Sequence, residues 1–538
     1  MAVVQNDLLK RGDLVVKRKK EEHGTPKTVR MVRSEAEIQM LLDDIDRALL
    51  SGDKTRMDAL MEQLWLERRQ VPEALTRRIV DGRAHIPAFA FEMLGIFAGK
   101  KALSYLKRVA NDRGVADIVR FGAQRRLGWP ERGEAKRRMA FLGTLDDAEG
   151  TLIEAINQAT ITWPPQSDIL EEVLGYLEVM PTEQRQAVVV RAVAKLNIEA
   201  AWILQAVLHI PDLQTQRLAL GQLVKLRALG SSGAIERLAK TAQNPTIKNE
   251  AIASSQRLRM RTVGLQVQER PEPLPPVERV LLSMIDGDGG QVIIVVRSWG
   301  EDALMFADVF CNDHWGIKDV FGASRATPDQ VEDIVAGLEE EGIHLVEVDL
   351  AAARGVLAAA VEVNALSGHS IPPAFELWEP LMHDSYPPPE DEPASVCELD
   401  DTPYHGREDL IRASGQLADH DFFETWGFDP IRTLEAMVVT PPPSGGRLTD
   451  RQYRPLIEQL ADPTFRAQLR RRLRRQAWLL ERIGDTRARD QALAVASQFA
   501  NGRTDSLVKQ PFMRALVQHS VDRALISASI LEGGDFGF

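Results

Sequence analysis

The sequence predicts a mainly α-helical protein, in which a region of stacked helix pairs is followed by a small α+β domain and a helical C-terminal region. Three observations support this fold class. Apolar residues recur at helical spacing from residue 34 to about residue 265, short β-rich runs follow from residue 280, and helical patterning returns after residue 410. Since a single core stops growing near ~300 residues, a chain of 538 residues should form several domains.

The first segment, 1–33, is basic. It holds nine Lys/Arg and four Asp/Glu, so its net charge is 9 − 4 = +5, and we expect a flexible arm. At its end Ser34 and Glu37 have the spacing of a capping box, and Ile38, Leu41 and Leu42 follow with helical periodicity. These residues begin a helical domain predicted over 34–268.

Short punctuation by Gly, Pro and Asn separates the helices of this domain, so helices that follow one another should pack as antiparallel neighbours. Two of the predicted helices share a pattern of an apolar residue, a basic residue and, three positions later, Ala. The pattern occurs at 119–123 (VRFGA) and at 247–251 (IKNEA).

A proline-rich stretch at 270–276 cannot continue a helix and marks a domain boundary. Beyond it, the runs at 280–285, 292–297 and 303–310 predict an antiparallel meander. Thr327 and Pro328 then provide an N-cap and a first helical residue. A strand at 343–348 and an Ala-rich helix at 350–366 complete an α+β domain predicted over 277–378.

Residues 379–409 predict an acidic, Pro-rich linker that is unstructured or partly extended. They contain six prolines, ten acids and one arginine, giving a net charge of 1 − 10 = −9, and such a composition disfavours a packed core. The C-terminal helical domain is predicted over 410–538.

An Arg-rich helix predicted at 465–482 is the strongest candidate for a binding surface. Leu469, Leu473, Ala477 and Leu480 form its apolar stripe, and the opposite arc carries Arg470, Arg471, Arg474, Arg475 and Trp478. Guanidinium groups beside an aromatic ring suit phosphates and stacked bases, or an acidic protein partner. The alternative is a solvated helix face countered by the protein's own acidic linker.

Two loops provide further candidates. Asp286 and Asp288 resemble the start of a calcium loop, but the sixth and twelfth positions do not fit, and an Asp-Gly hairpin turn is the favoured interpretation. Asn312, Asp313 and His314, beside Cys311, could supply a nucleophile and a base. Their alternative role is to cap the loop. The remaining histidines lack the spacing of a metal site, and we expect neither a metal nor a cofactor.

The layout of the chain resembles that of a known group. Helices with the 119–123 pattern, a meander that begins DGDGGQ (286–291) and an Arg-rich helical tail are similar to bacterial HEAT-repeat-containing proteins, whose C-terminal halves have no assigned activity. In the second helix of such repeats the apolar residue and Ala pack inward and the basic residue caps the turn. The resemblance implies an α-solenoid and protein–protein association. An irregular helical bundle with chance matches is the alternative.

Composition limits the function. The net charge is 66 − 78 = −12, of which −9 belongs to the predicted linker, so a nucleic-acid partner is not excluded. Two distant cysteines indicate a reducing compartment, and no stretch approaches the ~18 apolar residues of a membrane span. We therefore expect a cytoplasmic location and no membrane partner. The sequence does not predict the oligomeric state.

Three functions follow from these features. The first is a non-enzymatic scaffold or adaptor that binds a protein partner through the helical-repeat surface. The second is a nucleic-acid-binding accessory protein that uses the basic arm and the Arg-rich helix. The third is an enzyme with a site near Asp313 and His314. It is the least favoured, because one sequence gives no view of selection at those positions; the nucleophile elbow, the phosphate loop, the dinucleotide fingerprint and the HExxH zinc motif are also missing from the sequence.

Overall fold

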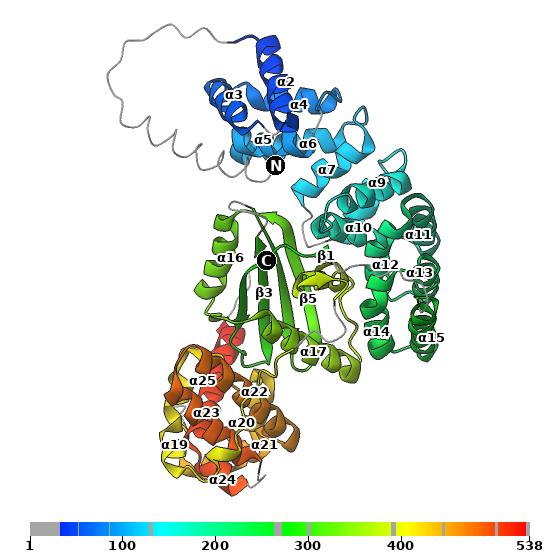
Figure 1. Ribbon diagram of the computed structural model, residues 1–538. Helices are drawn as coiled ribbons and strands as arrows, with labels where there is room; N and C mark the ends of the chain where they lie inside the picture. Colours follow the sequence, from blue (N-terminus) through cyan, green and yellow to red (C-terminus); the bar gives the residue numbers. More distant parts are fainter. Residues whose placement is uncertain are drawn as a thin grey trace, which may run out of the picture.

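The computed structural model describes residues 33–51, 53–84, 87–128, 133–262, 272–298, 303–388, 394–443, 447–500 and 504–533. Apart from Arg33, the predicted basic arm lies outside these ranges. The protein is mainly helical, with a small antiparallel five-stranded sheet and a group of C-terminal helices (Figure 1).

The N-terminal half consists of helices that form an arc around one side of the sheet (Figure 1). The predicted capping box is present at its start, where the backbone N–H of Ser34 donates to Glu37 Oε2 at 2.6 Å. The helices are α2 (Glu35–Ser51), α3 (Lys54–Leu66), α4 (Val71–Val80), α5 (Pro87–Ala98), α6 (Ala102–Asn111), α7 (Asp117–Leu127), α8 (Glu134–Leu142), α9 (Ala148–Thr160), α10 (Ser167–Val179), α11 (Thr182–Leu196), α12 (Ala201–Val207), α13 (Leu213–Leu226), α14 (Ser232–Thr241) and α15 (Pro245–Thr262).

Two buried arginines connect neighbouring helices of this arc. Arg120 of α7 donates to the carbonyl oxygens of Ala110, at 3.1 Å, and Thr144, at 2.9 Å. Arg185 of α11 donates in the same way to the carbonyl oxygen of Leu177 at 2.6 Å and pairs with Asp212 at 2.9 Å. Each guanidinium thus satisfies carbonyl groups at a helix end that have no partner within their own helix.

The sheet has the strand order β5-β4-β3-β2-β6, with every neighbouring pair antiparallel. The three predicted meander strands and the short later strand are confirmed, whereas β5 was missed. The strands are β2 (Val277–Ser283), β3 (Gly290–Ser298), β4 (Leu304–Asn312), β5 (Gly316–Ala326) and β6 (Leu345–Glu347). A separate two-stranded pair joins β1 (Glu272–Pro273) to β7 (Ser385–Tyr386).

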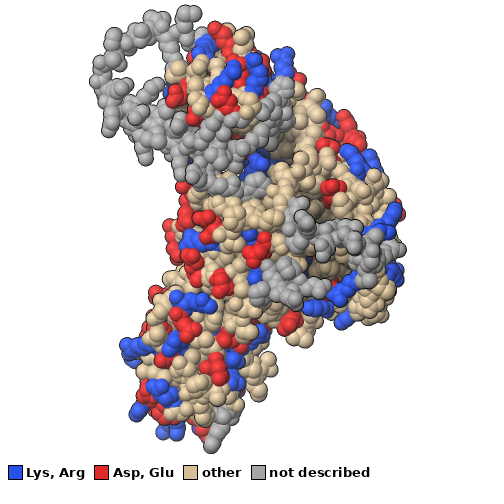
Figure 2. Space-filling model, in the orientation of Figure 1, with Lys and Arg blue, Asp and Glu red and all other residues tan. Residues whose placement is uncertain are grey.

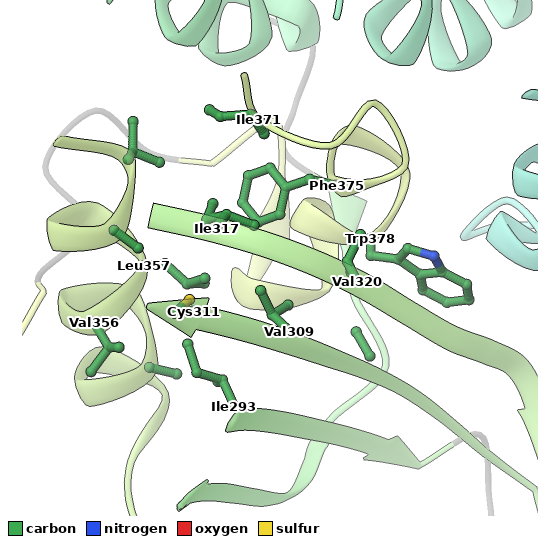
Figure 3. Close-up of a cluster of buried hydrophobic side chains, with 14 of the residues drawn as sticks. Ile293, Val309, Cys311, Ile317, Val320, Val356, Leu357, Ile371, Phe375 and Trp378 are labelled. Atoms are coloured by element: carbon green, nitrogen blue, oxygen red, sulfur yellow. The ribbon is translucent and has the colours of Figure 1, made fainter. Parts of the chain in front are cut away.

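Helices pack on both faces of the sheet, α16 on one and α17 with α18 (Phe375–Trp378) on the other. The predicted helix after Thr327 is α16 (Pro328–Glu340), and its capping box with Gln330 is formed. The predicted Ala-rich helix is α17 (Leu350–Ser367), and Figure 3 shows Leu357 of this helix beside Cys311 of the sheet.

Helix α17 is also long and apolar enough to cross a membrane by length and composition alone, which the sequence analysis did not anticipate. Half of this helix is buried inside the structure, so packing against the sheet accounts for its apolar composition.

The C-terminal helices form a separate group at one end of the sheet (Figure 1). They comprise α19 (Glu408–Ala413), α20 (Pro430–Val439), α21 (Asp450–Leu460), α22 (Pro463–Arg482), α23 (Thr486–Phe499), α24 (Thr504–Lys509) and α25 (Pro511–Gly533). Helix α22 contains the predicted Arg-rich run.

The segment expected to be an unstructured or partly extended linker is packed against the rest of the protein over 379–382 and 394–401, so it is not unstructured there. Its first residues extend α18 (Phe375–Trp378) as a buried 3₁₀ turn, Glu379–Met382. Residues 394–401, here called the acidic segment, lie between α17 and α22. The N–H of Ser395 donates to Ala351 O at 2.8 Å, and the N–H of Leu399 donates to Arg474 O at 3.3 Å.

Two features explain why this charged segment is ordered. A Cβ on Gly355 of α17 would lie 1.9 Å from the carbonyl oxygen of Ser395, so only glycine allows the segment to approach so closely. Arginines of α22 neutralise its carboxylates, as described below. Composition predicts disorder only when the charges have no partner in the fold.

Candidate functional site

The two groups of candidate residues, predicted independently, lie together where α22 meets the turns of the sheet. The β2–β3 turn carries Asp286 and Asp288, and the β4–β5 turn carries Asn312, Asp313 and His314. The structure therefore brings the Arg-rich helix α22 and both loops together. We call this contact between the turns of the sheet and the C-terminal helices the junction.

Arg472 is at the centre of this junction. Its guanidinium group donates to both carboxylate oxygens of Asp313, at 2.6 and 2.8 Å, and to the carbonyl oxygen of Gly287. The side chains of Arg472 and Asp313 are only 6% and 8% exposed. Such a bidentate pair fixes both distance and orientation, so it holds α22 against both turns.

Arg472 was left out of the predicted face, although the sequence held a signal for it. It lies three residues after Leu469 and four residues before Gln476, and all three of these residues are buried. This spacing places Arg472 on the buried stripe of α22. Sequence analysis assigned the stripe by apolarity, and a buried arginine does not satisfy that criterion.

The β2–β3 turn is a hairpin turn, as favoured over a calcium loop. Asp286 Oδ1 accepts hydrogen bonds from the N–H groups of Asp288, at 2.9 Å, and Gly290, at 2.6 Å. Gly289 has a φ of +84°, and a Cβ there would lie 2.0 Å from Asp313 Oδ1. Glycine is therefore required both by the backbone conformation and by the approach of the second turn.

The β4–β5 turn is tied to the first one. Asn312 donates through Nδ2 to the carbonyl oxygen of Asp288 at 3.1 Å and accepts from the N–H of His314 at 2.8 Å. The ring of His314, with a side chain 46% exposed, has its Nε2 3.7 Å from Asp313 Oδ1 and 3.3 Å from Arg472 Nη2. These contacts correspond to the loop-capping alternative.

The nucleophile–base interpretation of this loop has no support from the geometry. Cys311 is 4% exposed and lies among apolar side chains between the sheet and α17 (Figure 3). Burial raises the pKa of its thiol to about 12, which disfavours the reactive thiolate. The Asp313 carboxylate is bound by Arg472, so it is not free to act as a base toward this thiol.

The predicted arginine face meets the acidic segment. Arg470 donates to both oxygens of Asp401, at 2.7 and 2.8 Å, and this hydrogen bonding raises the pKa of Arg470. Arg471 and Arg474 both reach Glu398, at 3.0 and 3.3 Å. These contacts agree with the alternative in which the protein's own acidic residues counter the face.

Trp478 does not lie on an exposed arginine face, which corrects its predicted position. It is 6% exposed, and the guanidinium of Arg482 lies 4.7 Å from its ring centroid. Helix α22 is buried at every position from Gln476 to Leu480, because its C-terminal half packs inside the helical group. The ring is therefore covered on the side where a base would have to stack.

A second buried charge cluster, which the sequence analysis did not identify, joins the arc to the sheet region. Arg237 of α14 donates to Glu376 at 2.9 Å and to Glu379 at 2.8 Å, and His383 lies 2.9 Å from Glu379. Burial would raise the pKa of Glu379, but Arg237 and His383 outweigh it and lower that pKa to about 2. The partners are about 140 residues apart, so no local pattern could reveal them.

Two hollows lie at or near the candidate surfaces. An open groove of about 640 Å³ lies on the arc between α7, α9 and α11, with Ile118 and Ile153 among its apolar lining residues and Glu154, Arg191 and Lys195 among its charged ones. A cavity of only about 20 Å³ lies in the junction of α22, the two turns and α17.

Comparison with known proteins found no matching family model, no matching curated protein and no matching solved structure.

Proposed function

We propose that this protein is a non-enzymatic adaptor that binds a protein partner through the surface of its helical arc, α2–α15. We interpret the arc as a HEAT-like α-solenoid. Support comes from Arg120, whose contacts match the turn-capping role of the basic residue in the repeat, and from Ala123, which is fully buried. In the second matching segment Ile247 and Ala251 are also fully buried, whereas Lys248 is exposed.

The observation that carries the proposal is the open groove between α7, α9 and α11. Stacked helices present extended surfaces of this kind to partners. The two basic lining residues are held by exposed ion pairs, Arg191 with Glu149 at 2.7 Å and with Asp147 at 3.8 Å, and Lys195 with Glu154 at 3.1 Å. Because exposed pairs contribute little to stability, a partner could replace them at small cost while it covers the apolar floor.

The nucleic-acid alternative is less well supported. Its central residues are engaged within the protein, Arg470 with Asp401 and Arg471 with Glu398. On the face shown in Figure 2, blue and red side chains alternate over the described C-terminal helices, and phosphate binding depends on clustered positive charge.

A cytoplasmic location is part of the adaptor proposal. It is supported by the two cysteines, which are both free.

The test is quantitative affinity capture from native lysate with the full chain. We compare the wild-type protein with the double variant Arg191→Glu and Lys195→Glu, whose side chains are 50% and 55% exposed. Arg217→Glu is the matched control, since Arg217 is 45% exposed and pairs with Glu250 on helices outside the groove.

The adaptor function predicts a stoichiometric protein that the wild type and the control retain and the double variant loses. Two results would contradict it: no stoichiometric partner with the wild type, or a partner retained equally by all three proteins. A low-salt gel shift with DNA and RNA tests the alternative, which requires binding that weakens steeply as salt is added.

A further inference from the structure

A pocket at the last helices of the arc lies apart from the groove of the proposed adaptor surface. It is formed by α13, α14, α15, the residues just before α13 and the loop that follows α17, and its volume is about 260 Å³. Pockets for drug-sized ligands measure ~300–1,000 Å³. This pocket, here called the His209 pocket, therefore suits one ring-sized molecule.

The lining of the His209 pocket favours an uncharged ligand. At its mouth Gln243 and Ser370 are exposed, and at its floor Leu238, Ile247 and His209 are buried. None of the described residues that line it is an Asp, Glu, Lys or Arg. An ion bound against this floor would lose water without gaining a counter-charge, which is costly.

A buried carboxylate behind the pocket holds the ring of His209. The residue is 4% exposed, and its Nε2 lies 2.9 Å from Oε1 of Glu376. Burial would raise the pKa of Glu376, but Arg237 and His209 outweigh it and lower that pKa. Because an ionised carboxylate only accepts hydrogen bonds, the proton of the neutral ring belongs on Nε2, and Nδ1 carries a lone pair.

The polar atoms that remain available in the lining are mostly acceptors. Within the described part of the chain, Nδ1 of His209 takes part in no hydrogen bond. Gln216 and Gln243 each donate an amide N–H to a carbonyl oxygen of the chain at 3.0 Å, so their Oε1 atoms remain acceptors. Asn244 Oδ1 accepts from the N–H of Thr246 at 2.9 Å, which leaves its Nδ2 as a donor.

We propose that the His209 pocket binds a small, uncharged, planar ring that carries an amide or amino group, as nicotinamide and the nucleobases do. The N–H groups of the ligand donate to His209 Nδ1 and to the glutamine oxygens, and its carbonyl oxygen or ring nitrogen accepts from Asn244. Its face covers the apolar floor of Leu238 and Ile247. A carboxylate would meet acceptors instead of donors, and a sugar would place hydroxyl groups against this floor. Because Ser370 comes from the loop after α17, the ligand also joins the arc to the α+β domain.

Binding is measured by saturation-transfer difference NMR on the full chain at pH 8, where an imidazole is neutral, with nicotinamide and adenine in separate samples. At least one of these two probes should receive saturation from the wild type. Nicotinate, which has a carboxylate in place of the amide, should bind at least about fivefold more weakly, the effect of leaving one buried polar group unsatisfied. Glucose is the polyol probe and should receive no saturation.

Two pocket variants test the role of the lining. His209→Phe keeps a ring and removes Nδ1, so the affinity for the bound probe should fall at least about fivefold. His420→Phe is the matched control, because His420 also has its Nε2 near a carboxylate, Asp485 at 3.3 Å, but belongs to the C-terminal helices. If His209→Phe does not fold, Ser370→Trp replaces it, since a large side chain at this exposed position blocks the mouth. Its control is Ser104→Trp, at an exposed position of α6.

Loss of probe binding in the pocket variant, with binding retained in its control, supports the proposal. Three results overturn it. The first is that the wild type saturates neither nicotinamide nor adenine. The second is that nicotinate or glucose binds as tightly as these probes, and the third is that the wild type and the pocket variant bind with equal affinity.

Discussion

Replacing Asp313 by Asn should release α22 from the two turns of the sheet. The substitution keeps the size of the side chain but removes the charge that balances Arg472, whose side chain is 6% exposed. Leaving one member of a buried ion pair without its partner costs about 3–5 kcal/mol. At about 1.4 kcal/mol per factor of ten, the equilibrium for opening the junction should increase between about a hundredfold and a few thousandfold.

Hydrogen exchange measured by mass spectrometry is the appropriate assay, because it reports local opening in a chain too long for one unfolding transition. Peptides that cover 286–291 and 311–317 should exchange faster by this factor in Asp313→Asn, while peptides of α2–α6 should not change.

The pair Arg407–Asp409 provides the control. It has the same bidentate geometry, with distances of 3.0 and 2.7 Å, but its side chains are 50% and 59% exposed. Asp409→Asn should therefore leave exchange in its own surroundings almost unchanged. The reasoning is refuted if Asp313→Asn leaves the protection of both turns at the wild-type level, or if the two substitutions have equal local effects.

Three further predictions follow from buried polar groups. Alkylation of Cys311 in the folded protein at pH 8 should be about a thousandfold slower than in the unfolded chain, since its pKa moves from 9.0 to about 12; fast labelling would contradict this. Burial, aided by Asp319, raises the pKa of Asp308 to about 7, so the folded state holds a proton that the unfolded state releases near pH ~4. Stability should therefore fall as pH rises from about 4 to 7. In thermal scans Asp308→Asn should be more stable than the wild type at pH 8 and not at pH 4, and a less stable variant at pH 8 would exclude this cause. Arg120→Met should cost about 3 kcal/mol of local stability, because the carbonyl groups of Ala110 and Thr144 lose charged donors. Hydrogen exchange in peptides around these two residues should therefore become about a hundredfold faster, whereas the exposed Arg217→Met should change exchange in its own surroundings little; equal effects would remove the argument for turn capping.

Short-range patterns in the sequence correctly predicted the elements that depend on residues only a few positions apart. The capping boxes at Ser34 and Thr327 depend on residues three positions apart, and the β2–β3 turn depends on glycines within five residues. Strand β5 was missed because its exposed and buried positions do not alternate regularly. A bulge between Phe310 and Cys311 shifts its register with β4, so the period-two pattern of a strand is lost.

The candidate site shows the limit of such signals. The sequence alone identified the arginines of α22 and the polar residues of both turns as the chemically distinctive groups. It could not show that they meet, because Arg472 and Asp313 are 159 residues apart. It also placed Trp478 on an exposed face, whereas α22 is buried all round at that level.

Residue types and short spacings thus determined the helices, the hairpin turn and the amount of charge in each segment. Only the tertiary structure decided which charges meet. The acidic segment, which by itself predicts disorder, is ordered because Gly355 allows close approach and Arg470, Arg471 and Arg474 neutralise it. The physical reason is that desolvation and ion pairing depend on what lies nearby in space, and a sequence specifies neighbours along the chain but not the partners that folding brings together.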